Sequence, residues 1–186
     1  MQTNTFFKYH ALLCVLLAVF IAQIFCEDSL PTGYKDIHFG MSVDAVKDAL
    51  KADASFGYRG DRDVSLSKSE NQTLIETDAE RYAPNSFLTR CWFQFYDDEL
   101  CTITLNLRRS KIDYHAIFST LTEKYGEPSS LSPNRAEWRD DNVIMSLEKP
   151  LTLKYVDKQV FDERQSSSRA SKSVDEQSKE DFLEGL

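Results

Sequence analysis

The chain has 186 residues, of which 41% are hydrophobic, 12% aromatic and 28% charged, and these proportions are typical of a folded domain. Its length suits one domain core and not two. The formal net charge of −8 argues against nucleic acid as a partner, because binding to a phosphate backbone relies on clustered Lys and Arg side chains. The basic cluster Arg108, Arg109 and Lys111 is too small to change that.

Residues 1–26 are predicted to be an export signal or an N-terminal anchor. The stretch from Ala11 to Ile24 is apolar apart from Gln23, and polar chain begins at Glu27. Such a run suits the h-region of a signal peptide, whereas a helix that crosses the hydrocarbon core needs about 20 apolar residues. We therefore expect an exported protein of the periplasm or cell envelope of a bacterium, and we expect any membrane association to use this segment.

Two alternatives stay open for this segment. No small-x-small cleavage site precedes Glu27, so the segment is either cleaved or kept as an anchor. Cys26 could carry a lipid if it became the new N-terminus, but bulky Phe25 stands where lipidation requires a small residue.

Residues 27–161 are predicted to form one domain, which begins with a helix. Ser42 suits a helix N-cap, and Val43, Val46 and Leu50 recur at helical spacing behind it. Two stretches with weak alternation of apolar and polar residues then follow and are predicted as strands, at residues 64–67 and 73–77.

A hairpin formed by residues 87–96 and 99–107 is the strongest strand signal. With the turn centred on Asp98, Cys101 is expected opposite Phe95, and Cys91 opposite Leu105. The two sulfurs would then lie about four residues apart along the ladder, or about 13 Å. Because a disulfide tolerates a Cα separation of about 7 Å, we predict two buried free thiols, although export would permit a bond.

A second helix is predicted behind Asp113, which suits an N-cap. Gly126 ends this helix and Pro128 prevents it from resuming. Three short strands are predicted after it, at residues 136–139, 143–148 and 151–156.

The order helix, strands, helix, strands predicts an α+β fold, with an antiparallel sheet and two helices packed on one face. Two related halves, each a helix followed by an antiparallel meander, are an open alternative. Residues 162–186 are Ser-rich and charged, and they are predicted to be a disordered tail because they can bury little apolar surface.

No catalytic, cofactor-binding or metal-binding residue is predicted. Outside the first 26 residues the histidines are His38 and His115, and neither has a second ligand at metal spacing. Sequence motifs for a serine nucleophile, a zinc protease or a phosphate-binding loop are missing. We therefore expect a protein without enzymatic activity.

The candidate partner contacts fall into two groups. Trp92, Gln94 and Tyr96 alternate away from the apolar side of the hairpin, so Trp92 either covers a second apolar layer or lies on an open sheet face. Arg59 and Arg62 belong to a turn that could be the protruding loop of an inhibitor.

Two segments together resemble a known type of protein. They are Ile37-His38-Phe39-Gly40-Met41-Ser42, and Leu121 to Pro128 (LTEKYGEP) followed by Trp138 and a strand ending in Tyr155. The pattern resembles small bacterial envelope proteins of uncharacterised function. More remotely, it is similar to the domain shared by the β-lactamase inhibitor protein and the small BamE/SmpA lipoprotein of outer-membrane assembly. The resemblance covers roughly residues 34–161 and brings no catalytic residues.

The leading functional hypothesis is an exported, envelope-associated binding or assembly module that contacts another protein or an envelope component. The alternative is an inhibitor or sequestering protein that acts on an enzyme. A hydrolase is third, and it would need a cleft with carboxylates of shifted pKa, such as around Glu123 and Glu137.

Overall fold

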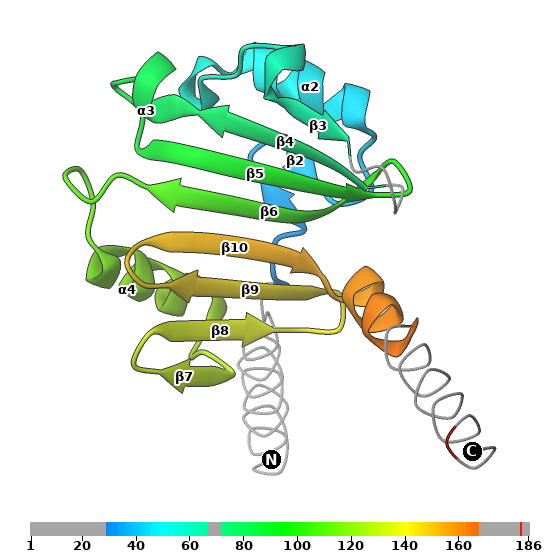
Figure 1. The fold of residues 1–186 in the computed structure, drawn as a ribbon. Helices are drawn as coiled ribbons and strands as arrows, with labels where there is room; N and C mark the ends of the chain where they lie inside the picture. Colours follow the sequence, from blue (N-terminus) through cyan, green and yellow to red (C-terminus); the bar gives the residue numbers. More distant parts are fainter. Residues whose placement is uncertain (1–28, 67–71, 168–182, 184–186) are drawn as a thin grey trace, which may run out of the picture.

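The computed structural model describes residues 29–66, 72–167 and 183, so the predictions for residues 1–26 and for nearly all of the tail lie outside the described residues. An eight-stranded antiparallel sheet organises the fold, in the order β3-β4-β5-β6-β10-β9-β8-β7 (Figure 1). Its strands are β3 (Val64–Leu66), β4 (Gln72–Asp78), β5 (Leu88–Tyr96), β6 (Glu99–Leu107), β7 (Ser130–Ser132), β8 (Arg135–Arg139), β9 (Val143–Glu148) and β10 (Thr152–Asp157). The predicted α+β class with an antiparallel sheet is confirmed.

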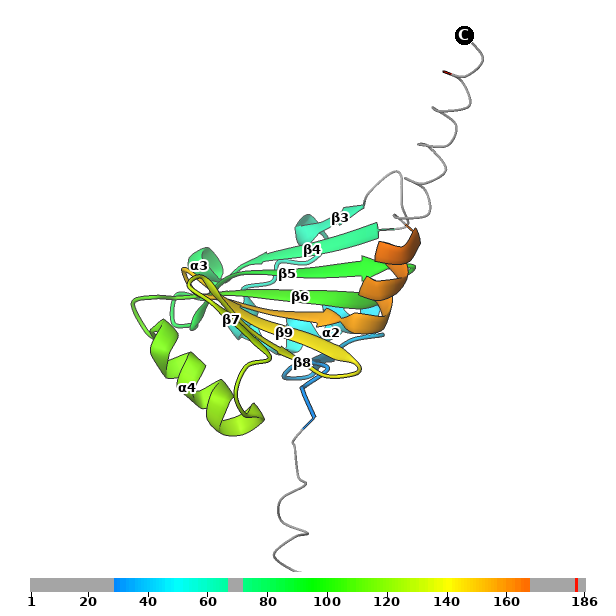
Figure 2. The same cartoon turned by 90° about the horizontal axis from the view of Figure 1, so that it is seen from below.

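The two long helices predicted from sequence, α2 (Val43–Ala52) and α4 (Tyr114–Tyr125), lie on the same face of the sheet (Figure 2). Val46 and Leu50 of α2 are fully buried in one core with the strand residues. From α4, the Phe118 ring lies 5.9 Å from the Trp138 ring of β8. The prediction of two helices on one face is therefore confirmed.

Local capping explains where these helices begin and end. The Ser42 hydroxyl accepts a hydrogen bond from the Ala45 backbone N–H at 3.3 Å, and the Asp113 carboxylate accepts one from Ala116 at 2.9 Å. At the end of α4, Gly126 has a φ of +77°, a conformation that a side chain would strain. The cap residues predicted from sequence are those that the structure uses.

The sheet repeats one order of elements twice. The helix α2 is followed by the meander β3-β4-β5-β6, and α4 is followed by β7-β8-β9-β10. The two meanders meet where β6 pairs antiparallel with β10, with Leu105 opposite Leu153 and Ile103 opposite Tyr155. The helix-then-meander organisation is thus present in both halves.

The register in the central hairpin differs from the prediction at one point. Leu100, not Cys101, lies opposite Phe95. The turn has two residues, and a β-bulge follows at Cys101, where the partner of Gln94 becomes Thr102. Beyond the bulge the register agrees with the prediction, so Cys91 does lie opposite Leu105, and both cysteines are buried free thiols as predicted.

Several short elements had no clear sequence signal. They are the two-stranded sheet β1 (Gly33–Tyr34) and β2 (Ile37–His38), the 3-10 helices η1 (Ala54–Phe56) and η2 (Asp61–Asp63), the one-turn helix α3 (Ala79–Tyr82), and β7. Of the helices in the described residues, none is long and apolar enough to span a membrane.

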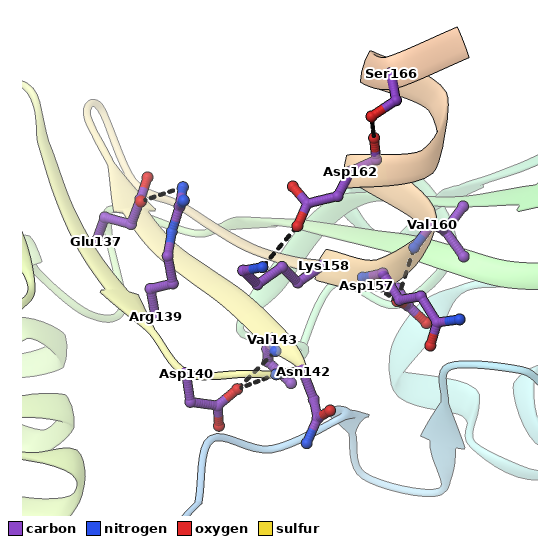
Figure 3. Close-up of polar contacts among 11 residues, drawn as sticks. Glu137, Arg139, Asp140, Asn142, Val143, Asp157, Lys158, Val160, Asp162 and Ser166 are labelled. Carbon is purple, nitrogen blue, oxygen red and sulfur yellow. Dashed lines mark hydrogen bonds and ion pairs between the residues drawn. The ribbon is translucent and has the colours of Figure 1, made fainter.

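A further helix occupies residues 158–167 and crosses the predicted domain boundary after Phe161. Asp157 caps it by accepting from the backbone N–H groups of Gln159 and Val160, at 3.0 and 3.2 Å. Lys158 pairs with Asp162 one turn later at 2.6 Å (Figure 3). The first six residues of the predicted disordered tail are therefore helical, because a cap and an ion pair offset their low apolar content.

Candidate functional site

One face of the sheet carries neither α2 nor α4, and Trp92 lies near its middle. Antiparallel pairing places Trp92 of β5 between Glu76 of β4 and Thr104 of β6. Residues paired this way share a face, which is opposite to the face of Phe93 and Ile103. Of the two alternatives for Trp92, the structure shows the open sheet face, where its side chain is half-buried.

The row through Trp92 continues across the junction of the two halves. Lys154 of β10 lies opposite Thr104 on one side and opposite Ser146 of β9 on the other. Neighbouring strands are about 4.8 Å apart, so the Trp92 and Lys154 backbones are separated by roughly 10 Å. Within the described residues, no ion pair or hydrogen bond is made by the half-buried Lys154 side chain.

Charges farther along the open face neutralise one another. Glu137 of β8 forms ion pairs with Arg135 and with Arg139, the second at 2.9 Å (Figure 3). Glu148 of β9 lies 3.5 Å from Arg135 and accepts from the Ser146 hydroxyl at 3.0 Å. On the other side of Trp92, Glu76 pairs with Arg90 at 3.2 Å. Lys154 therefore differs from these neighbours in having no carboxylate partner in the described part of the chain.

Gln94 and Tyr96 occupy the end of the open face that helix 158–167 reaches. The Arg164 guanidinium lies 5.2 Å from the centre of the Tyr96 ring. A pocket of about 360 Å³ opens here, with Gln94, Leu74 and Arg164 in its wall. The three strand residues named from the sequence thus share one face, with Trp92 central and Tyr96 beneath the helix.

Comparison with known proteins places the domain in a family. The family model of the TP0088 domain matches residues 32–167, which is most of the chain. The chain belongs to the TP0088 domain family. No curated protein and no solved structure matches it. The remote likeness to the β-lactamase inhibitor protein and the BamE/SmpA lipoprotein stays a prediction.

In this TP0088 domain, the Arg59 side chain contacts residues of its own domain. Its backbone N–H donates to Asp63 at 2.8 Å, and its guanidinium pairs with the same carboxylate. The guanidinium also donates to the Tyr82 hydroxyl at 3.2 Å and lies 4.6 Å from the centre of that ring. Arg62 is exposed. No contact among the described residues joins either arginine to Trp92, so the sequence candidates do not form one site.

The two carboxylates named for a hydrolase are also separated. Glu123 is exposed on α4, which packs on the covered face, whereas Glu137 points to the open face with Arg135 and Arg139. Within the residues that the structure describes, no group of three His, Cys, Asp or Glu side chains could hold a metal ion. In this TP0088 domain, Glu123 and Glu137 therefore do not converge on a common substrate position.

Sequence reasoning missed Lys154 as a candidate contact. The strand that carries it was predicted, and alternation of Leu153 and Tyr155 toward the core gives the signal that Lys154 points outward. Its position beside Thr104 depends on the pairing of β6 with β10, which joins residues about 50 positions apart and leaves no local sequence signal.

Proposed function

We propose that this protein is an exported module of the bacterial cell envelope, without enzymatic activity, whose open sheet face binds another protein or an envelope component. The observation that carries the proposal is the position of Trp92. It lies in the middle of a sheet face that α2 and α4 leave uncovered, in one row with Thr104 and Lys154.

Two physical arguments support a binding role for this row. A tryptophan that stays partly exposed on a sheet offers a large, rigid contact area, and such residues are enriched at the centre of interfaces. A half-buried lysine without a carboxylate partner loses hydration without a compensating contact, and a partner's carboxylate would supply that contact. The partner's contact surface is therefore acidic next to an apolar or aromatic group.

The envelope location rests on the apolar run from Ala11 to Ile24. The likeness to small envelope proteins, and more remotely to the BamE/SmpA lipoprotein, fits the same location and an assembly role. The inhibitor alternative would use the loop that contains Arg59 and Arg62. It is less favoured because the Arg59 side chain is already engaged by Asp63 and Tyr82.

Photo-crosslinking tests the proposal in cells that produce the full chain. A photoreactive amino acid replaces the exposed Gln94 on the open face, and a matched control replaces Lys124, which is exposed on α4 behind the sheet. We expect a discrete crosslinked product from position 94 and not from position 124. The Trp92→Ala substitution should remove that product while the amount of folded protein stays unchanged.

Fractionation of the same cells tests the location. Recovery of the mature chain with the envelope or periplasm supports export, and recovery with the cytosol contradicts it. Equal crosslinking from both positions, or crosslinking that survives Trp92→Ala, would contradict binding through the open face.

A further inference from the structure

The turns at the two ends of the sheet carry opposite charges. At the left in Figure 1, the connections 79–87, 108–113, 133–134 and 149–151 contain five cations and two carboxylates, Glu80 and Asp113. The cations are Arg81, Arg108, Arg109, Lys111 and Lys149. At the right, the strand turns 97–98 and 140–142 contain four carboxylates and no cation, and helix 158–167, which begins at this end, adds Lys158 and Arg164 together with Asp162 and Glu163. A chain with a net charge of −8 thus has one positive end, which we call the basic end.

An exposed phenylalanine belongs to the basic end. Phe87 precedes β5, and 55% of its surface is exposed. Buried aromatic rings are the norm in this domain, as Phe56, Phe93 and Phe95 show. A single exposed apolar side chain is common on protein surfaces, so Phe87 points to a partner only through the charged groups around it.

The segment that carries Phe87 is hydrogen-bonded to the basic loop beside it. The Arg108 backbone N–H donates to the Phe87 carbonyl at 2.7 Å, and its guanidinium donates to the Ser86 carbonyl at 3.2 Å. The Lys111 ammonium donates to the Asn85 carbonyl at 2.6 Å and lies 5.7 Å from the centre of the Phe87 ring. Three consecutive carbonyls are thus bound by the loop that supplies the positive charge, and the Lys111 ammonium of that loop lies beside the ring.

A second exposed aromatic ring nearby has the same surroundings. Tyr82 of α3 is 44% exposed, with the Arg81 guanidinium 5.4 Å and the Arg59 guanidinium 4.6 Å from the centre of its ring. Aromatic rings that reach outward between Arg and Lys side chains suit the boundary between lipid headgroups and acyl chains.

We infer that the basic end of the sheet docks on an anionic lipid surface. Phe87 enters the boundary of the acyl chains, and Arg81, Arg109 and Lys111 lie against the lipid phosphates. Cations near an anionic leaflet are attracted within about one Debye length, and one inserted apolar side chain adds a second, hydrophobic contribution to reversible binding. The acidic turns at the opposite end are repelled, so the charge separation also orients the domain.

A lipid surface fits this end better than an acidic protein does. The apolar group at the basic end protrudes on a turn, whereas the pockets of about 330 and 360 Å³ are lined by residues of the opposite end, among them Asp140 and Arg164. A protruding ring can be buried either in a deformable surface such as a lipid bilayer or in a pocket of a receptor protein. The cations clustered beside the ring have few carboxylates among them that would fix one docking geometry. This end therefore favours a negatively charged surface and does not require one particular shape.

Vesicle sedimentation tests the inference with a chain that lacks residues 1–26, because that apolar segment would bind any vesicle. Among the described residues, the core begins at Leu30, beyond the end of the deletion. Vesicles are made of phosphatidylcholine alone or of phosphatidylcholine mixed with phosphatidylglycerol. We expect sedimentation with the anionic vesicles at low salt, and release by added salt.

The variants are Phe87→Ala and the double variant Arg109→Glu/Lys111→Glu. We expect the double variant to weaken binding to anionic vesicles by more than about tenfold, and Phe87→Ala by about tenfold. The matched control Lys51→Glu/Lys124→Glu changes net charge equally but lies on α2 and α4, and it should weaken binding far less. Trp92→Ala should have no effect, which separates this inference from the proposed role of the open face.

Three outcomes would overturn the inference. These are absence of binding to anionic vesicles, equal binding to neutral vesicles, or equal losses from the control and the basic-end double variant. A fourth outcome would assign the basic end to an acidic protein: vesicle binding insensitive to the variants while a crosslink formed at position 109 in cells disappears with Phe87→Ala.

Discussion

Asp63 binds Arg59 through both of its carboxylate oxygens. One oxygen accepts from the Arg59 backbone N–H at 2.8 Å, and the other pairs with the guanidinium. The Asp63 side chain is completely buried, whereas about a third of the Arg59 side chain is exposed. Because the guanidinium also contacts Tyr82, this pair ties η2 to α3 at the edge of the sheet.

Replacement of Asp63 by alanine should therefore destabilise the domain. It leaves a backbone N–H and a guanidinium without their acceptor, at a cost of about 2 to 3 kcal/mol. Urea unfolding of wild type and Asp63→Ala measures the difference in the free energy of unfolding. The matched control is Asp61→Ala, which removes the ion pair of the exposed Asp61 with Lys47 at 3.4 Å and should cost far less than Asp63→Ala. Similar small losses for both variants would contradict the structural role of Asp63.

The hairpin turn between β5 and β6 offers a stabilising substitution. Asp97 and Asp98 have φ values of +50° and +66°, as a two-residue turn of type I′ requires. Glycine adopts a positive φ without strain, so Asp98→Gly should stabilise the domain by about 0.5 to 1 kcal/mol in urea unfolding. Asp141→Gly is the control, because Asp141 has no positive φ, and it should not stabilise. Equal effects of the two glycines would contradict this explanation.

The thiol of Cys91 should be unreactive in the native protein. Burial raises the pKa of the Cys91 thiol from 9.0 to about 12. Only the thiolate reacts with iodoacetamide, so at pH 8 Cys91 should be alkylated on unfolding and not before. Mass spectrometry of peptides labelled with and without urea measures this. Rapid labelling in the folded protein would contradict the burial of Cys91.

The same shift makes stability depend on alkaline pH. Below pH 9 both folded and unfolded chains keep the Cys91 proton, so the contribution of this group is fully present. Between pH 9 and pH 12 the unfolded chain loses the proton first, and stability falls by up to about 1.4 kcal/mol per pH unit. The Cys91→Ala variant is less stable at neutral pH but should show a shallower alkaline slope in urea unfolding. An unchanged slope would contradict the prediction.

Features fixed by neighbouring residues could be predicted from the sequence. The helix α4 was predicted from its cap at Asp113, its spacing of apolar residues and its stop at Gly126, all within 14 residues. The covered and open faces of β5 followed from alternation, which is why Trp92, Gln94 and Tyr96 were correctly grouped.

Features that depend on distant partners could not be predicted. The bulge at Cys101 was missed because a two-residue turn plus one bulged residue gives the same register beyond the bulge as a longer turn. Lys154 meets Thr104 only because β10 pairs with β6, and Arg59 meets Tyr82 only in the folded chain. Residue types at these positions are compatible with many other pairings, so local patterns do not select one.

Lys154 provides the sharpest test of the open face. No described residue pairs with its ammonium group, so Lys154→Met should leave the free energy of unfolding unchanged or raise it slightly. The same variant should weaken capture of an acidic partner by about tenfold or more, because a charge pair that excludes water is lost. Urea unfolding and the crosslinking yield from position 94 measure the two effects separately.

The control for Lys154→Met is Arg135→Met, which removes ion pairs with Glu137 and Glu148 on the same face. It should lower stability by about 1 kcal/mol, since it leaves the largely buried Glu137 with one cationic partner instead of two. A substitution that weakens binding and leaves the free energy of unfolding unchanged identifies a residue that pairs with another molecule. A substitution that lowers the free energy of unfolding identifies a residue that pairs within the domain. If Lys154→Met lowered stability as Arg135→Met does, or left crosslinking intact, the lysine would belong to the fold and the open face would lose its charge complementarity.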